Sequence, residues 1–460
     1  MEIVVGKYTL ESLTTGMYKD PFILYREYIQ NSTDSIDEAI NNKILTKGNE
    51  QIKIVINREQ REITIEDNGT GIETDEAYKV LTDIGNSKKK YTTHKGFRGI
   101  GRLGGLSYCE KLEFETSCVN EKVKTIVEFD SDHLKELLIP GKYEDYTMVD
   151  VIKEISEKKI EQEDKEKHYF KVKLKGVSDK FKLLDIDKVE NYLCQVAPVE
   201  FNGKFRLRDK INNMLQELKL ENNEYKIFLG TSETEMFPII KPYKMKFYAD
   251  ISKKIEDTLS NVKFKVIRND HLNKIIAVVW YGESNLLGTI VDEKVKGLRV
   301  RKEGILIGDR FLLNDVFKEE RFNGWVQGEV FVFDDKIIPN ARRDDFERNK
   351  EYLYLIEELR KVGEQISYEI REASKLRNQK NSGIEQIAVD DIKSIHNNEK
   401  FTLTISEKSE NIDDEFENLF NEFERENSEK NILKKIEEIL REELDEEKVK
   451  KMLKRIEKFF

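Results

Sequence analysis

Three short segments near the N-terminus combine residue types that can bind and hydrolyse a nucleotide. They are residues 27–34, the turn at residues 67–72 and the glycine run at residues 96–101. Together they offer a carboxylate suited to a general base, an amide oxygen for a metal ion, a second carboxylate for adenine, and a backbone that can cradle phosphates. This combination predicts a site for ATP and Mg²⁺.

The first segment lies in a stretch, residues 21–40, that predicts an amphipathic helix. Glu27, Asn31 and Asp34 are spaced four and seven residues apart, which places them on one face. In this interpretation Glu27 polarises a water molecule and Asn31 offers its amide oxygen to Mg²⁺. The same pattern also fits an exposed helix with a merely solvated acidic face. A second, apolar stripe consists of Phe22, Tyr25, Ile29, Ile36 and Ile40.

The second segment follows two runs with strand-like alternation, residues 52–56 and 62–65, so Asp67 stands at a strand end. Its carboxylate can accept the exocyclic amine of adenine, which guanine lacks at the equivalent position. Gly69 and Gly71 let the backbone approach a planar ligand. The alternative is an ordinary hairpin turn, because Asn-Gly is a common turn signal.

The third segment has glycines whose spacing lets backbone amides point at phosphate oxygens. It matches neither the Rossmann nor the Walker pattern. The preceding residues 85–95 are polar and basic, as a lid over a triphosphate would be, although a solvated surface loop has the same composition. The residues predicted to contact the nucleotide here are Ser87, Lys88, Gly96, Arg98, Gly99, Ile100 and Gly101.

In order and spacing, these three segments resemble the motifs of the GHKL ATPases, which have the Bergerat nucleotide-binding fold. The resemblance implies that Glu27 is the general base, Asn31 the Mg²⁺ ligand and Asp67 the adenine contact, with Asp34 in the same pocket. Gly69 and Gly71 would make room for adenine. The family usually closes its pocket with a Gly-Thr pair on a later strand; the corresponding strand here, residues 168–174, lacks that pair, so no residue is assigned to this contact.

A second resemblance lies at residues 328–344, which are similar to the catalytic-loop region of the transducer domain in the chaperone and MORC branches of that family. Arg343 stands at the position of the basic residue that reaches the γ-phosphate, a role that suits the planar guanidinium. Alternatively, Arg342 and Arg343 form salt bridges with neighbouring acidic residues. A transducer after the ATPase domain argues against a histidine kinase.

The expected fold class is α/β, with helices on one face of a mixed sheet in the ATPase domain. We expect a GHKL ATP-binding domain at residues 1–180, a mixed α/β transducer at 181–376, a linker at 377–405 and a charged helical tail at 406–460. Residues 153–167, dense in Lys and Glu, predict an exposed loop or helix. The tail either packs on the transducer or forms a partner surface.

The amino-acid composition limits the classes of binding partner and the cellular location that we expect. The chain of 460 residues has 79 Lys and Arg against 90 Asp and Glu, and its net charge of −11 disfavours indiscriminate nucleic-acid binding. The three cysteines show no disulfide or metal spacing, which predicts free thiols. No signal pattern or long apolar run suggests a membrane protein, so a cytoplasmic location is expected.

These features predict a Mg²⁺-dependent ATPase that acts as a conformational machine. ATP would close the lid, dock the domains and favour a homodimer, which would remodel or clamp a protein client in a chaperone-like or MORC-like manner. The alternatives are an ATP-gated DNA clamp, a prokaryotic defence subunit that acts on a neighbouring effector protein, and a non-catalytic ATP-binding switch or scaffold.

Overall fold

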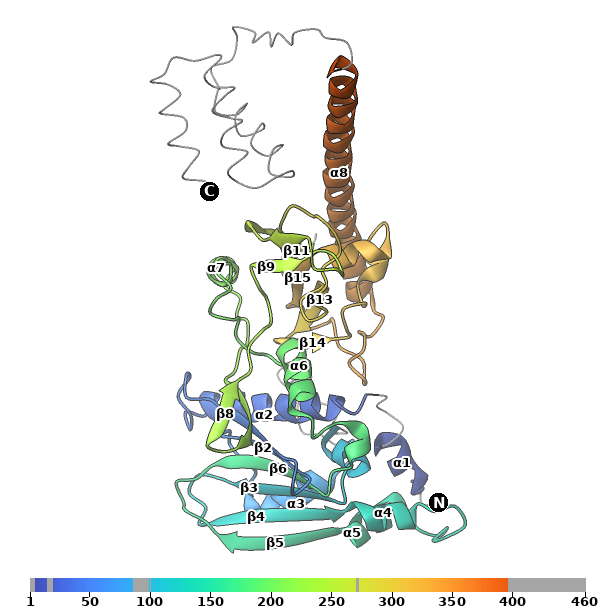
Figure 1. The fold of residues 1–460 in the computed structure, drawn as a ribbon. Coiled ribbons are helices and arrows are strands. Elements are labelled where there is room, and N and C mark those ends of the chain that lie inside the picture. The colour runs from blue at the N-terminus through green and yellow to red at the C-terminus, as the bar shows by residue number, and fades with distance from the viewer. Residues whose placement is uncertain (1–4, 15–19, 86–98, 100, 270–272, 396–460) are drawn as a thin grey trace. The chain divides into compact units, whose positions relative to one another are not determined.

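The computed structural model describes residues 5–14, 20–85, 99, 101–269 and 273–395. The chain divides into two compact units, Met1–Asn381 and Ser382–Phe460. The described part of the first unit contains an eight-stranded sheet, a five-stranded sheet and a two-stranded ribbon (Figure 1). This mixed α/β architecture agrees with the predicted fold class.

The eight-stranded sheet has the order β5-β4-β3-β6-β2-β1-β7-β8. Its strands pair antiparallel except for β1 and β7, which are parallel, so the sheet is mixed. The strand bounds are β1 (Ile52–Asn57), β2 (Glu62–Asp67), β3 (Lys111–Ser117), β4 (Val123–Asp130), β5 (Ser156–Gln162), β6 (Tyr169–Lys175), β7 (Ile227–Ser232) and β8 (Glu235–Pro238).

Helices pack against this sheet through one apolar core. Alternate residues of β1 and β2, among them Ile54 and Ile65, point into that core together with Tyr25 and Ile29 of α2. The long helix α2 is drawn alongside the sheet in Figure 1. The helical segments of this part are α1 (Tyr8–Thr14), α2 (Ile23–Asn41), α3 (Thr74–Thr82), η1 (Gly101–Ser107), α4 (Ser131–Leu137), α5 (Met148–Ile155), η2 (Asp179–Phe181) and α6 (Ile186–Val196).

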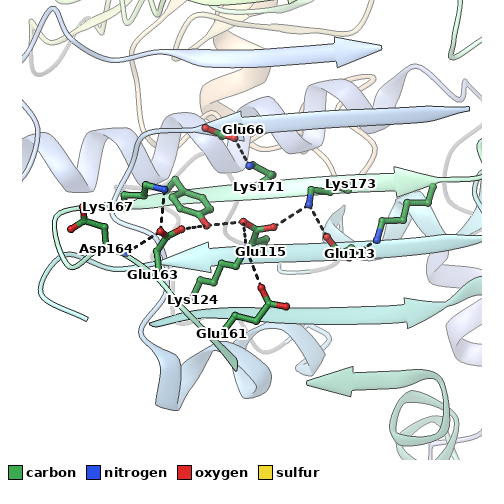
Figure 2. A network of polar contacts seen from close by, with 12 residues as sticks. Glu66, Glu113, Glu115, Lys124, Glu161, Glu163, Asp164, Lys167, Lys171 and Lys173 are labelled. Atoms are coloured by element: carbon green, nitrogen blue, oxygen red, sulfur yellow. Dashed lines mark hydrogen bonds and ion pairs between the residues drawn. The ribbon is translucent and has the colours of Figure 1, made fainter. Parts of the chain in front are cut away.

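The alternate side chains of the central strands form a network of charges on the sheet (Figure 2). On β3, Glu115 lies 3.0 Å from the ammonium of Lys173 and accepts a hydrogen bond of 2.7 Å from Tyr169. Glu113 is also 3.0 Å from Lys173, and Lys171 pairs with Glu66 at 2.8 Å. These strands therefore have two different faces. Alternate side chains of one face form the apolar core, and paired opposite charges cover the other face.

The segment at 153–167 differs from its prediction. Instead of an exposed loop or helix, residues 156–162 form the edge strand β5, which pairs with β4. The pairing uses backbone groups, and the side chains of an edge strand can stay in water, so a charged composition is compatible with a strand at this position. The eight-stranded sheet also takes up β7 and β8, whose residues lie beyond the predicted domain boundary at 180.

The five-stranded sheet has the order β11-β12-β15-β13-β14, and β13 and β15 run parallel. One face packs against α8 through Leu355, Leu359, Val362 and Ile366. The other face packs on an aromatic group around Trp280. The remaining elements are α7 (Arg208–Glu217), β9 (Lys246–Tyr248), β10 (Glu256–Thr258), β11 (Asn261–Arg268), β12 (Ile275–Glu283), β13 (Gly297–Lys302), β14 (Ile305–Ile307), η3 (Asn314–Val316), η4 (Glu320–Trp325), β15 (Gln327–Val332) and α8 (Lys350–Ile395).

Helix α8 extends into the segment predicted to be a linker. The linker was expected at residues 377–405, but the described chain stays helical as far as Ile395. The extension is polar, yet it contains no proline and only Gly383, so no strong helix breaker interrupts it. The predicted tail at 406–460 lies outside the described residues.

Candidate active site

Glu27 lies on α2 where that helix meets both the glycine run and the loop after β15. Its side chain is 12% exposed, and its Oε1 atom is 3.9 Å from Nε of Arg343. A Cβ atom added to Gly101 would lie 2.2 Å from the Glu27 Oε2 atom. The structure thus brings together three residues that the sequence analysis selected from distant parts of the chain.

The carboxylate of Glu27 lies close to two guanidinium groups. Within the described residues, its Oε1 atom is buried and accepts no hydrogen bond. Arg26 and Arg343 each place a guanidinium nitrogen 3.9 Å from that oxygen. A buried carboxylate with a free acceptor position can take a proton from a water molecule.

Arg26 fastens the loop that carries Arg343 to α2. Its Nη2 atom donates to the carbonyl oxygen of Arg342 at 2.8 Å, and its Nη1 atom donates to that of Arg343 at 3.4 Å. Arg26 itself is only 6% exposed. Sequence reasoning missed this residue, because its backbone acceptors have no residue-type signature and only its neighbour Glu27 belonged to a motif.

Arg343 adopts a left-handed backbone with φ of 57°. For a residue other than glycine this costs about 1 kcal/mol or more, and such strain often marks functional sites. The amide of Gly308 donates to its carbonyl oxygen at 2.9 Å. Burial lowers the pKa of the Arg343 guanidinium from its ordinary value, while the carboxylate of Glu27 acts in the opposite direction.

The acidic residues that follow Arg343 have other partners. Asp344 accepts a 2.6 Å hydrogen bond from the side-chain amide of Asn340, and Asp345 accepts one of 2.6 Å from the hydroxyl of Tyr352. These bonds shape the loop. Arg343 forms an ion pair with Glu27, and its predicted role at the γ-phosphate stays a prediction.

The turn after β2 is packed tightly against its surroundings. Asp67 is 1% exposed, and one of its carboxylate oxygens accepts a hydrogen bond of 3.0 Å from the amide of Gly69. A Cβ at Gly69 would lie 2.1 Å from Oγ of Ser35, and one at Gly71, where φ is 70°, would lie 2.0 Å from the carbonyl oxygen of Ser117. Both glycines thus allow close approach of protein to the turn; whether they also make room for adenine stays a prediction.

Side chains from β3 and the start of β6 hold the same turn. The Nδ1 atom of His168 lies 2.7 Å from the carbonyl oxygen of Gly69, and because a carbonyl only accepts, this nitrogen carries the proton. Thr116 accepts from the amide of Ile72 at 2.8 Å. A strand was expected at residues 168–174 with no role for its side chains, and no local sequence pattern signals the contact of His168 with Gly69.

Tyr28 anchors the far end of the glycine run. Its hydroxyl accepts from the amide of Gly105 at 3.1 Å and donates to the carbonyl oxygen of Arg102 at 3.1 Å. A Cβ at Gly105 would lie 2.5 Å from that hydroxyl. Two consecutive residues of α2 therefore contact this region: Glu27 lies against Gly101, the last residue of the run, and Tyr28 binds the segment that follows it.

The other predicted residues are placed as follows. Asn31 lies one turn after Glu27 on α2 and is partly exposed, whereas Asp34 is 3% exposed. Gly99 has φ of 70°, and its carbonyl oxygen accepts from the amide of Gly85 at 3.4 Å. Their nucleotide contacts stay predictions. Five predicted residues lie outside the described part of the chain: Ser87, Lys88, Gly96, Arg98 and Ile100.

Cys109, Cys118 and Cys194 are free thiols, as expected. Burial raises the pKa of the Cys109 thiol to about 12, so it stays protonated at neutral pH. Among the helices that the structure describes, none is long and apolar enough to span a bilayer.

Comparison with known proteins identifies the N-terminal part. Residues 24–161 match the family model described as histidine kinase-, DNA gyrase B-, and HSP90-like ATPase. Chaperone protein HtpG of Paraburkholderia xenovorans is 30% identical over 128 residues, which cover 24% of this chain and 20% of the relative. HtpG of Dechloromonas aromatica is 36% identical over 90 residues, covering 18% and 14%, and that of Escherichia coli K12 is 25% identical over 166 residues, covering 32% and 25%.

The aligned segments span at most a quarter of these HtpG proteins. The matched region contains Glu27, Asn31, Asp67 and Gly101, and it ends well before Arg343. Residues 24–161 thus form a GHKL-type ATPase domain, similar to that of the heat-shock-chaperone branch.

Proposed function

We propose that this protein binds ATP with Mg²⁺ and hydrolyses it. The observation that carries the proposal is the position of Glu27, whose carboxylate lies beside Gly101 on one side and 3.9 Å from Arg343 on the other. A general base, a phosphate-binding backbone and a cation for the transition state are thereby within reach of one another.

Adenine would be recognised by the carboxylate of Asp67, which the amide of Gly69 orients through a 3.0 Å hydrogen bond. A carboxylate accepts from the exocyclic amine of adenine, whereas it would face the carbonyl oxygen of guanine at the same position. We therefore expect ATP to bind much better than GTP.

The residues on α2 fit a magnesium ion. Asn31 is partly exposed and lies one turn from Glu27 on α2. A neutral oxygen ligand combined with phosphate oxygens is a usual environment for Mg²⁺. When bound, the ion would neutralise part of the phosphate charge, and Asn31 would hold it.

In the hydrolytic step, Glu27 accepts a proton from the attacking water, which makes that water a better nucleophile. Arg343 stabilises the negative charge that develops on the phosphoryl oxygens. Arg26 keeps the loop of Arg343 docked on α2 through its two backbone contacts. These roles assign one task to each of three adjacent charged side chains.

The cellular role that we infer is chaperone-like remodelling of a protein client, driven by ATP-dependent closure and dimerisation. Its support is the similarity of the ATPase domain to that of HtpG proteins. The net charge of −11 makes the alternative, an ATP-gated DNA clamp, less favourable. ATPase rates with unfolded protein and with duplex DNA at low salt separate the two: stimulation by DNA alone would overturn the chaperone-like role.

The test of the ATPase proposal uses Glu27→Gln with Glu38→Gln as the control, since Glu38 is an exposed residue on the same helix. Calorimetric titration with ATP, GTP and ADP is combined with phosphate release. We expect Glu27→Gln to bind ATP but lose turnover by about 10²-fold or more, with the control unchanged. Hydrolysis at the wild-type rate in Glu27→Gln would rule out Glu27 as the base.

A further inference from the structure

Four charged residues, none of which belongs to the proposed active site, form a cluster. We refer to Glu224, Lys241, Arg301 and Glu329 as the buried charge cluster. Lys241 and Glu329 are 0% exposed, and Arg301 is 1% exposed. Glu224 is 19% exposed, at the edge of the cluster. Burial of the other three charges is unusual, because removing an ion from water costs free energy unless it is well paired.

The pairing within the cluster is close. The ammonium of Lys241 lies 3.2 Å from Oε2 of Glu329 and 3.4 Å from Oε1 of Glu224. Nε of Arg301 donates to Oε1 of Glu329. Burial alone would raise the pKa of Glu329, but Arg301 and Lys241 outweigh it and lower that pKa, so Glu329 is ionised. Each carboxylate oxygen of Glu329 therefore has its own cation.

Arg301 also ties the cluster to α6. Its Nη2 atom donates to the carbonyl oxygen of Gln195 at 2.8 Å, and its Nη1 atom donates to those of Gly304 at 2.8 Å and Ala197 at 3.4 Å. The planar guanidinium thus holds the end of α6, which packs on the eight-stranded sheet, next to β13 of the five-stranded sheet.

A second set of contacts leads from the cluster to the helix that carries Glu27. Tyr225 directly follows Glu224, and its hydroxyl donates to Asp37 of α2 at 2.6 Å. The amide of Tyr225 donates to the carbonyl oxygen of Pro198 at 2.8 Å. The position of Glu224 is therefore linked to α2 through one residue.

A third set leads to the loop that carries Arg343. Glu329 is on β15, the strand from which the chain continues into that loop. Lys302, next to Arg301 on β13, donates to the carbonyl oxygen of Asp334 at 2.9 Å, just after the end of β15. Two adjacent cations of β13 therefore bind the chain where it leaves β15. Arg301 pairs with the carboxylate of Glu329, and Lys302 donates to the backbone of Asp334.

We propose that the buried charge cluster positions the loop of Arg343 relative to Glu27 on α2, a role that rests on the ATPase function proposed above. Apolar side chains of the same volume would often stabilise an interior as well as a buried ion group does. What the ion group adds is direction, because hydrogen-bonded ion pairs, above all those of the planar Arg301 guanidinium, have preferred geometries. The residues of the cluster are positioning residues and touch no reacting atom.

The test compares Glu329→Gln with Glu113→Gln. Glu113 is a matched control because it is 7% exposed and paired with Lys173, but lies in the charge network of the eight-stranded sheet. We expect Glu329→Gln to lower kcat at least about tenfold while Kd for ATP changes less than about twofold, since small misplacement of catalytic groups affects the rate more than binding. The control should leave both constants unchanged.

A direct geometric readout makes the test independent of turnover. Spin labels are placed at Asn42, exposed at the end of α2, and at Asp335, exposed in the loop after β15, in a Cys118→Ser background. Wild type should give one narrow distance distribution and Glu329→Gln a broader one. If Glu329→Gln does not fold, the double variant Lys241→Met with Glu329→Leu takes its place. It removes one charge of each sign and fills the space with apolar side chains.

The outcomes separate the two proposals. A narrow distribution in Glu329→Gln, or a kcat equal to that of Glu113→Gln, would show that the cluster only stabilises the fold. If wild type hydrolyses no ATP, the proposed function fails, and the distance distributions alone then decide whether the cluster positions the loop. An increase in Kd for ATP with unchanged kcat would also overturn the positioning role.

Discussion

The guanidinium of Arg343 lies 3.9 Å from the carboxylate of Glu27, although the two residues are near opposite ends of the described chain. Arg26 holds the backbone of Arg342 and Arg343 on the same helix. The contact therefore depends on a docked loop rather than on two flexible side chains. The roles of Glu27, Arg26 and Arg343 can therefore be tested one at a time by substitution.

Replacement of Arg343 should affect turnover much more than binding. We expect Arg343→Ala to reduce kcat by roughly 10³-fold, the lower range for an arginine that stabilises a transferring phosphoryl group. Arg343→Lys should recover only part of this, because an ammonium lacks the planar fork. Phosphate release at saturating ATP is the measurement. The exposed neighbour Arg342, changed to alanine, is the control; equal losses in both variants would point to a structural effect.

Gly101 should tolerate no side chain. An added Cβ would lie 2.2 Å from the Glu27 carboxylate, which must then move. We expect Gly101→Ala to keep its fold but lose about 10²-fold in kcat, as a displacement of about 1 Å at a catalytic group does. Gly6→Ala is a control because nothing lies within 4 Å of its added Cβ. Normal turnover in Gly101→Ala would mean that Glu27 acts from another position.

His168 should control nucleotide affinity rather than the chemical step. Its Nδ1 atom lies 2.7 Å from the carbonyl oxygen of Gly69, in the turn that orients Asp67. Losing this hydrogen bond, worth about 1 kcal/mol, should weaken ATP binding by about fivefold in His168→Ala. Calorimetry measures Kd and phosphate release measures kcat. His133→Ala, on the partly exposed helix α4, is the control; a fall in kcat at unchanged Kd would contradict this role.

The charge network of the eight-stranded sheet should make stability depend on pH in the acidic range. Burial would raise the pKa of Glu115, but the hydrogen bond from Tyr169 and the contacts with Lys173 and Lys171 lower it from 4.5 to about 2. Because the folded pKa lies below the unfolded one, the stabilisation is fully present above about pH 4.5 and is lost as the pH falls toward about 2.

Urea unfolding at several pH values from about 6 down to about 2 measures this dependence. Glu115→Gln should be less stable than wild type at pH 6 and should approach it as the pH falls. The control is Glu157→Gln, whose side chain on β5 is 64% exposed and pairs with Lys159 at 3.2 Å. An identical pH dependence in wild type and Glu115→Gln would exclude Glu115 as its source.

Much of the site was predictable because its signals are local. The spacing of Glu27, Asn31 and Asp34 and the apolar stripe beside them predicted α2, and alternation predicted β1 and β2 with Asp67 at the strand end. Such patterns follow from the periods of helix and strand, which a sequence carries within a few residues.

Other features could not be predicted because they depend on partners far away in the chain. Arg26 and His168 donate hydrogen bonds to backbone carbonyl oxygens. Every residue has such an oxygen, so the sequence does not show which one is bound. Strand β5 is rich in charged residues and lacks the alternation of a half-buried strand, and its strand structure depends on pairing with β4. The helix α8 passes through a polar segment that composition alone assigned to a linker.

The amino-acid sequence by itself therefore determined the kinds of chemical groups available and the local elements that carry them: the carboxylates of Glu27 and Asp67, the glycines and Arg343. Only the tertiary structure decided that Arg343 meets Glu27, that His168 supports the turn of Asp67, and that Glu329 is buried between two cations. The physical reason is that a local pattern limits backbone conformation, whereas contacts between distant segments arise from packing and from the need to pair every buried charge.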